Sequence, residues 1–210
     1  MRRLFLCSTV FSLILGAASA QEKNISLGIS VSDGRLQSFY LAIGDYYRVP
    51  EVEVVALRDR YRLQDEELPV VYFLAARIQV SPSIIIGFRS RGMSWLDITF
   101  HYGLTPEIYY VPVTVERVGP PYGNAYGYYK KYRPSKQWKK IKLNDHEVID
   151  LVNLRFISEH YRMSPEVVIE MRGRGESFIR INEEGGRAKS QQKGQQGKGK
   201  KDQGGKGKHK

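Results

Sequence analysis

The sequence repeats part of itself, because residues 80–98 are similar to residues 163–181, which lie 83 positions later. Identical positions in the two copies include Ser81/Ser164, Pro82/Pro165, Arg89/Arg172, Arg91/Arg174, Gly92/Gly175, Ser94/Ser177 and Ile98/Ile181. A supersecondary unit of this length cannot bury its apolar face alone, so repetition predicts that similar units stack around a common core.

Each copy carries the signals of a short helix that follows a turn. Ser81 and Ser164 suit the N-cap position, and the proline after each suits the first helical residue, whose N–H needs no partner. A glycine then ends each helix after about ten residues. Trp95, which follows the first of these turns, is predicted to be a core residue. A longer apolar stretch precedes each copy, at 68–78 and 148–161, and a fainter copy follows a third stretch near 36–47. We therefore predict a mainly α fold of stacked two-helix repeat units.

The first twenty residues are typical of a secretory signal peptide. A basic pair, Arg2 and Arg3, precedes an apolar run at 4–15, and the small residues that end at Ala20 predict cleavage before Gln21. The apolar run is shorter than the roughly 20 residues that cross a bilayer. We therefore expect no transmembrane span after cleavage.

The only cysteine, Cys7, lies inside this signal segment. The mature chain would then have no disulfide, no thiol nucleophile and no cysteine metal ligand. Export without disulfides favours a bacterial periplasm or exterior over a small disulfide-rich secreted domain. We predict an exported protein that is periplasmic or extracellular.

Charge is divided unevenly along the mature chain. The segment 117–142 has eight Lys/Arg and no acid, and the segment 186–210 has nine Lys/Arg and one acid, whereas the rest of the mature chain has 14 basic and 21 acidic residues. The chain thus divides into a signal peptide (1–20), a first helical repeat region (21–116), a basic Tyr/Gly-rich loop or linker (117–142), a second helical repeat region (143–185) and a tail (186–210).

The tail is rich in Lys, Gly and Gln and has no aromatic residue. Such a composition does not bury enough apolar surface to offset the entropy lost on ordering, so we predict a disordered tail. Its lysines would attract polyanions by a screened, salt-sensitive interaction, or would only keep the chain soluble.

The region between the two copies is rich in β-branched, aromatic and basic residues. Residues 108–118 are β-branched and aromatic, which predicts a short edge strand because Pro112 is excluded from central strands; residues 25–31 are its candidate partner. Cations and aromatic rings then alternate, and such a mixture can stack bases or sugars while it holds anionic groups. The candidate polyanion-binding residues are Tyr126, Tyr128, Tyr129, Lys130, Lys131, Tyr132, Arg133, Lys136, Trp138, Lys139 and Lys140.

The same segment has a second interpretation. Its charge of plus eight is close in size to the minus seven of the body, so the loop is also suited to lie on the body with its tyrosines half buried and its lysines paired.

The turn in the first copy has a recognisable sequence. Arg89 to Ile98 reads Arg-Ser-Arg-Gly-Met-Ser-Trp-Leu-Asp-Ile, and His101 to Leu104 reads His-Tyr-Gly-Leu. Together with the Ser-Pro turn, these residues resemble a helical module of uncharacterised exported bacterial proteins. The resemblance implies an α-helical fold and no known activity.

Sequence-specific DNA binding is disfavoured by the sequence. A helix, a turn and a Ser-Pro-capped helix also occur in DNA-binding proteins, but the helices that would read DNA, at 82–91 and 165–174, are largely apolar. Together with the acidic body, this argues against sequence-specific DNA binding.

Catalysis has little support, since His101, His146, His160 and His209 show no metal-binding spacing, and no nucleophile elbow or P-loop is present. We predict no enzyme, no cofactor and no metal. The leading interpretation is a non-catalytic interaction module of the cell envelope whose partner is an unknown envelope protein. The alternative is a protein that binds extracellular nucleic acid or anionic glycan through residues 122–142 and the tail. The third is a hydrolase with a dispersed site.

Overall fold

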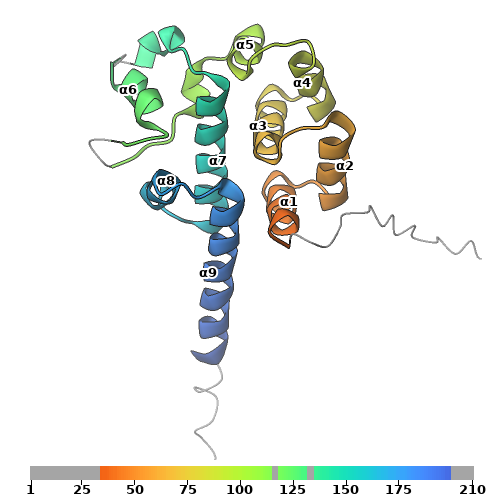
Figure 1. The fold of residues 1–210 in the computed structure, drawn as a ribbon, viewed down its shortest axis with the longest axis vertical. Coiled ribbons are helices and arrows are strands. Elements are labelled where there is room, and N and C mark those ends of the chain that lie inside the picture. The colour runs from red at the N-terminus through yellow and green to blue at the C-terminus, as the bar shows by residue number, and fades with distance from the viewer. Residues whose placement is uncertain (1–33, 115–117, 132–134, 200–210) are drawn as a thin grey trace, which may run out of the picture. The chain divides into compact units, whose positions relative to one another are not determined.

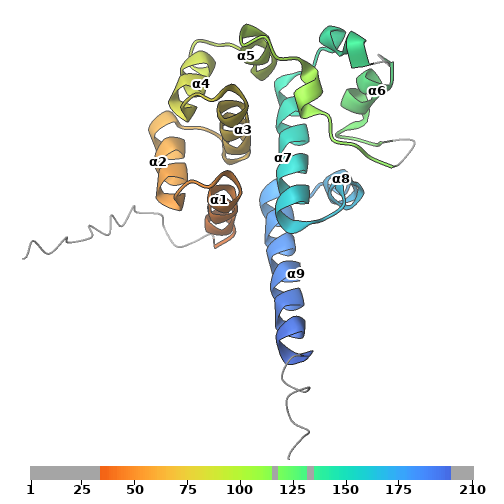
Figure 2. The same cartoon turned by 180° about the vertical axis from the view of Figure 1, so that it is seen from behind.

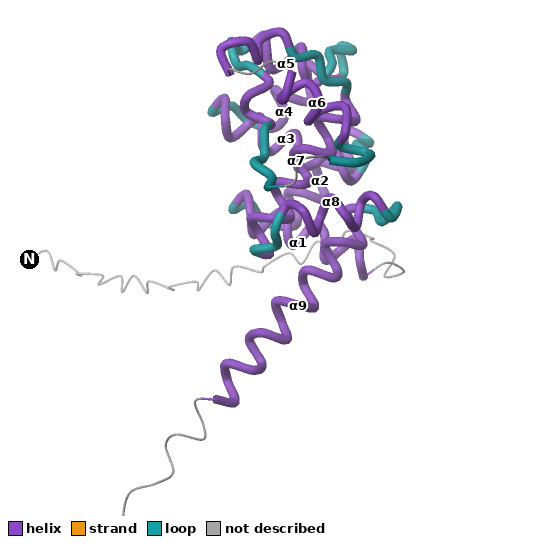
Figure 3. The backbone as a smooth tube through the Cα atoms, turned by 90° about the vertical axis from the view of Figure 1, so that its left-hand side faces the viewer, coloured by secondary structure: helices purple, strands orange, loops and turns teal. Residues whose placement is uncertain are grey.

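The computed structural model describes residues 34–114, 118–131 and 135–199, and every regular element within these ranges is a helix (Figure 3). The prediction of a mainly α fold is confirmed. The prediction of an edge strand at 108–118 is wrong where the chain is described. A 3-10 helix ends at Tyr109, and residues 110–114 form no strand. Pro106 begins that helical turn, and it carries Tyr109 into the core. The predicted signal peptide (1–20) and residues 25–31 lie outside the described residues.

The α-helices of the described chain are α1 (Gly34–Tyr47), α2 (Glu51–Tyr61), α3 (Leu68–Ile78), α4 (Pro82–Arg89), α5 (Trp95–His101), α6 (Gly123–Lys131), α7 (Asp145–Tyr161), α8 (Pro165–Gly173) and α9 (Phe178–Gly199). The 3-10 helices are η1 (Asp65–Glu67), η2 (Pro106–Tyr109) and η3 (Ser135–Lys140). α7 packs against α3, α8 and α9, and α1 packs against α2 and α9 (Figures 1 and 2). The core therefore lies between helices that are far apart in sequence.

The turns that lead into α2, α4 and α8 share one backbone geometry. The residue after the preceding helix is left-handed in each, at Arg48, Gln79 and Arg162. The next amide donates to a carbonyl five residues earlier: Val49 N to Gly44 O at 3.0 Å, Val80 N to Ala75 O at 3.1 Å, and Met163 N to Ser158 O at 3.1 Å. These bonds satisfy carbonyl groups that a helix end leaves without partners.

Both Ser-Pro turns begin helices, as predicted, because Pro82 and Pro165 are the first residues of α4 and α8. The Ser164 hydroxyl accepts a hydrogen bond from Val167 N at 3.4 Å, whereas the Ser81 hydroxyl bonds instead to that of Ser83. The capping role predicted from the sequence therefore applies to one serine of the two.

Corresponding residues of α2, α4 and α8 enter the core. Each helix buries a consecutive pair, namely Val54 and Val55, Ile85 and Ile86, and Val168 and Ile169. The glycines that follow α4 and α8, Gly92 and Gly175, have φ angles of 83° and 87°, where a side chain would be strained. Trp95 follows the first of these turns and is fully buried, as the sequence predicts.

The matching arginines of the two similar segments make matching contacts. Arg89 donates to Met93 O at 2.7 Å and lies 4.2 Å from the centre of the Trp95 ring. Arg172 donates to Glu176 O at 2.7 Å and lies 4.3 Å from the centre of the Phe178 ring. Each also pairs with a carboxylate 22 residues earlier, Glu67 at 3.2 Å and Asp150 at 3.1 Å respectively.

Two backbone amides connect the halves of the molecule. Trp95 N donates to Asp145 Oδ1 at 2.8 Å, and Phe178 N donates to Glu66 Oε1 at 2.9 Å. Each bond satisfies an amide at the start of a helix with a carboxylate from the other half. This exchange supports the contact between α3 and α7.

The basic segment is mostly helical and is not the loop that its composition suggests. α6 covers Gly123–Lys131, and η3 covers Ser135–Lys140. Glycine and proline around position 120 favoured a break, but the spacing of Tyr126 and Tyr129 gathers these rings on one side of a helix. Burial of that side provides the stabilisation that the local sequence lacks.

The disordered tail is not confirmed over residues 186–199, which belong to α9. Arg187 pairs with Glu183 at 2.6 Å, and Lys189 lies 5.6 Å from the centre of the Tyr161 ring. These contacts support the part of α9 that lies just beyond Ile181. Residues 200–210 lie outside the described chain.

No single helix in the described ranges is long and apolar enough to cross a membrane. Within those ranges, one pair of helices, Asp65–Ile78 and Pro82–Arg89, has sufficient apolar length when the two are taken together, but the pair is bent by 117°.

Candidate functional site

Three tyrosines from the basic segment point into the protein. Tyr122, Tyr126 and Tyr129 are buried, and their hydroxyl groups donate to backbone carbonyls: Tyr126 to Val111 at 2.7 Å, Tyr129 to Pro106 at 2.7 Å and Tyr122 to Asp150 at 3.4 Å. Burial raises the pKa of each tyrosine well above its usual value. The hydroxyl groups therefore stay protonated and act as donors that fasten α6 to the body.

Two more rings complete this group, which we call the aromatic layer: Tyr110, Tyr122, Tyr126, Tyr129 and Trp138. The Trp138 ring centre lies 5.0 Å from that of Tyr110 and 5.0 Å from that of Tyr129. Aromatic pairs at this separation add stabilisation beyond the area they bury. The contact between Tyr129 and Trp138 joins α6 to η3, which Figure 1 shows next to each other.

Lysines cover the outside of these two helices. We call Lys130, Lys131, Lys139, Lys140 and Lys142 the basic surface, and all five are exposed. Lys130, Lys139, Lys140 and Lys142 form no ion pair with the part of the chain that the structure describes. The segment 117–142 has no acidic residue of its own. The basic surface therefore presents positive charge to solvent on a support that is held by buried rings.

The sequence-predicted binding residues divide into four groups. Lys130, Lys131, Lys139 and Lys140 are exposed; Tyr128 and Trp138 are half-buried; Tyr126 and Tyr129 are buried; Tyr132, Arg133 and the side chain of Lys136 lie outside the described residues. Tyr110, also part of the aromatic layer, was not predicted from the sequence, because residues 108–118 favoured a strand.

The chain that leads toward α6 is tied to α8 by one carboxylate. Glu166 accepts from Thr114 N at 2.7 Å and from the Thr114 hydroxyl at 2.8 Å. These hydrogen bonds, with the backbone amide of Thr114 the strongest contributor, lower the pKa of Glu166 to about 2. The carboxylate is charged at neutral pH, and it fixes the segment on which Tyr110 and Val111 lie.

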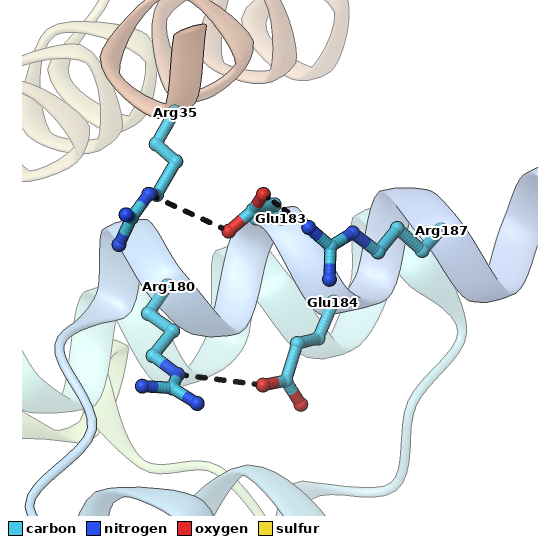
Figure 4. Close-up of a pocket in the computed structure, with 5 residues that line it drawn as sticks. All are labelled: Arg35, Arg180, Glu183, Glu184 and Arg187. Atoms are coloured by element: carbon cyan, nitrogen blue, oxygen red, sulfur yellow. Dashed lines mark hydrogen bonds and ion pairs between the residues drawn. The ribbon is translucent and has the colours of Figure 1, made fainter. Parts of the chain in front are cut away.

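A second charged site lies between α1 and α9, and Figure 4 shows its side chains. We call it the charged hollow, a surface depression of about 240 Å³ lined by Arg35, Arg180, Glu183, Glu184 and Arg187. Glu183 lies 3.7 Å from Arg35 and 2.6 Å from Arg187, and Glu184 lies 3.5 Å from Arg180. The arginines in this hollow are thus already paired with carboxylates.

His160 and the adjacent Glu159 make separate contacts. His160 packs against Tyr161, Phe156 and Tyr46, and burial lowers its pKa. Its neighbour Glu159 instead accepts a hydrogen bond from the Tyr46 hydroxyl and pairs with Arg155 at 3.4 Å. In the described ranges, no group of three or more His, Cys, Asp or Glu side chains is arranged to hold a metal ion.

Comparison with known proteins adds no assignment to this geometry. No protein-family model matches the chain, no curated protein matches it, and no solved structure matches it.

Proposed function

We propose that the protein is a non-catalytic interaction module of the cell envelope, and that its basic surface is the part that binds a polyanion. The supporting observation is that Lys130, Lys139, Lys140 and Lys142 are exposed and form no ion pair with the described chain. Cations that have no internal partner can displace the counterions condensed on an anionic polymer, which favours binding at low salt. The aromatic layer keeps these lysines on a fixed support.

The scaffold, in this proposal, consists of two stacked copies of one helix-turn-helix unit. Arg89 and Arg172 occupy equivalent positions and make the same three kinds of contact, to a backbone carbonyl, an aromatic ring and a carboxylate. A packed scaffold of this kind is suited to present a surface to a binding partner.

Export to the envelope is the part of the proposal that rests on residues 1–20 and on the sequence resemblance of residues 89–104. Expression of the full chain in a bacterium tests it. The expected mature protein begins at Gln21 and is found in the periplasmic or extracellular fraction. A cytoplasmic protein that retains Arg2 and Arg3 would contradict the proposal.

Binding is tested with immobilised heparin, a dense linear polyanion. We expect the protein to bind at about 50 mM salt and to elute as salt screens its charges. The variant Lys130→Gln/Lys139→Gln/Lys140→Gln should elute at lower salt than the wild type. Both proteins keep the cationic residues 186–210, so the difference reports on the basic surface. Identical elution of the two would show that this surface does not bind the polymer.

A second candidate function, binding of an envelope protein, has one observation in its favour. α2 and the start of α4 line a surface groove of about 260 Å³, and exposed apolar side chains lie on the same two helices at Val52, Tyr61 and Ile84. Exposed apolar groups of this kind are typical of protein contacts when they are contiguous. Loss of a co-purifying envelope protein in the Ile84→Lys variant, with unchanged heparin elution, would favour this candidate.

A further inference from the structure

We infer that the basic surface recognises its ligand through its ammonium groups, and that the ligand class is a linear anionic polymer whose bases or sugar rings do not stack on Tyr126 or Tyr129. This inference rests on the proposed function and makes it more specific. It replaces the combined stacking and charge recognition that the sequence predicts for these two tyrosines.

Two of the rings beneath the basic surface are closed off from solvent. Tyr126 and Tyr129 are buried, their hydroxyl groups are bonded to backbone carbonyls, and their rings contact each other and Tyr110. A ring that stacks a base must expose one face to solvent. These two tyrosines therefore support the surface from beneath and have no face with which to stack a ligand.

The charged groups of the basic surface are all ammonium groups. The basic surface consists of lysines, and an ammonium group is a point charge that does not match the planar geometry of one anionic group as a guanidinium does. Phosphate, sulfate and carboxylate are therefore comparable partners for it. A polymer with closely spaced anionic groups satisfies several lysines at once.

The lysines of the basic surface come from separate elements. Lys130 and Lys131 lie at the end of α6, Lys139 and Lys140 lie at the end of η3, and Lys142 follows η3. The charges are thus spread over two helices and the segment that follows them. This arrangement fits an extended chain of anionic groups better than a single compact anion.

The experiment compares ligands that share a charged backbone and differ in their rings. Fluorescence anisotropy is measured for a single-stranded oligonucleotide, an abasic phosphodiester chain of the same length, inorganic polyphosphate and heparin. We expect the oligonucleotide and the abasic chain to bind with dissociation constants within about threefold, because stacking would add about 1 to 3 kcal/mol for each base. Polyphosphate and heparin separate a preference for phosphate from one for sulfate and carboxylate.

Matched variants locate the contacts. For single strands, each phosphate contact contributes about 0.7 to the slope of log K against log salt, so Lys139→Gln/Lys140→Gln should reduce that slope by about 1.4. Arg180→Gln/Arg187→Gln removes the same charge from the charged hollow and should change the slope by less than half as much. Both variants alter exposed side chains, and their urea midpoints establish that they fold.

The outcomes are distinct. Binding of the oligonucleotide that is more than tenfold tighter than binding of the abasic chain would overturn this inference and leave the proposed function in place. Binding of no polymer at about 20 mM salt would overturn both. Equal losses in the two matched variants would place the ligand outside the basic surface and would also overturn the inference.

Discussion

The charged hollow and the basic surface both carry exposed cations, but the arginines of the hollow pair with carboxylates, whereas Lys130, Lys139, Lys140 and Lys142 form no ion pair with the described chain. On α9, Arg180 lies 3.6 Å from Glu176 and 3.5 Å from Glu184, each four residues away, and Arg187 lies 2.6 Å from Glu183. On α6 and η3 no acidic residue is available at such a spacing, because the segment 117–142 has none.

This difference shows that the sign of a region's net charge matters less for binding than the positions of its acidic residues. Carboxylates one helical turn from an arginine occupy its hydrogen-bond donors, and an incoming anion must displace them. A lysine without such a neighbour exchanges only water and counterions. The overall formal charge of plus eleven does not distinguish the two situations.

The largest effect is expected from removal of the ring that supports the basic surface. Tyr129 is fully buried and bonds to Pro106 O, so Tyr129→Ala should lower the free energy of unfolding by about 3 to 5 kcal/mol. Tyr129→Phe keeps the ring and should cost only about 1 kcal/mol for the lost hydrogen bond. Urea denaturation measures both.

Tyr128 is the matched control for this change. It lies on the same helix and is half-buried, so Tyr128→Ala should cost less than about 1 kcal/mol. Equal losses for Tyr128→Ala and Tyr129→Ala would show that α6 is not anchored through one face.

A smaller effect is expected when the charged hollow is made to resemble the basic surface. Glu183→Gln/Glu184→Gln removes two carboxylates that pair with Arg35, Arg187 and Arg180, while Glu176 still pairs with Arg180. The affinity for heparin at low salt should then rise roughly twofold to fivefold. Stability should fall by less than about 1 kcal/mol, since exposed ion pairs contribute little.

Glu51→Gln/Glu53→Gln is the control, because it changes the net charge equally on α2, away from the hollow. If this control raises the affinity as much, the gain reflects net charge and not release of the arginines. Anisotropy at about 50 and 300 mM salt compares the two variants.

The contribution of Glu166 is expected to depend on pH. Its carboxylate holds Thr114, and its pKa in the folded protein is about 2, below the ordinary value of 4.5. A lowered pKa in the folded state stabilises the protein above about pH 4.5, and this contribution disappears as pH falls from 4.5 toward 2.

The urea midpoints of the wild type and of Glu166→Gln should therefore differ at pH 6 and approach each other at pH 3 and below. The effect is expected to be small, because Glu166 is exposed and its interactions are screened by solvent. A difference that grows as the pH falls would contradict the assigned role of Glu166.

The parts of the fold that local sequence signals determine were predictable. Proline after serine placed the starts of α4 and α8, and the glycines at 92 and 175 placed their ends, because each residue type has its own backbone preference. The burial of Trp95 followed from its place just after a capped turn.

The candidate site was predictable in its charges and not in its rings. Alternating lysine and tyrosine indicates an aromatic and cationic segment, but only the packed structure decides which side of α6 faces inward. Glycine and proline near position 120 pointed to a loop, and packing of Tyr126 and Tyr129 against Tyr110 outweighed that local preference. The contact partner of Tyr129, the carbonyl of Pro106, lies 23 residues away and leaves no local signal.

The smallest effect is expected at Arg35, the one residue of the charged hollow that belongs to α1. Its ion pair with Glu183 has a separation of 3.7 Å, and its side chain is 58% exposed. An exposed pair at this distance contributes about 0 to 1 kcal/mol, so Arg35→Ala should shift the urea midpoint only slightly, and high salt should abolish the shift. Arg187→Ala, which removes the shorter contact with the same carboxylate at 2.6 Å, is the matched comparison. If Arg35→Ala instead costs more than Tyr129→Phe, the contact between α1 and α9 depends on this ion pair, and the hollow is a structural joint and not merely a neutralised surface.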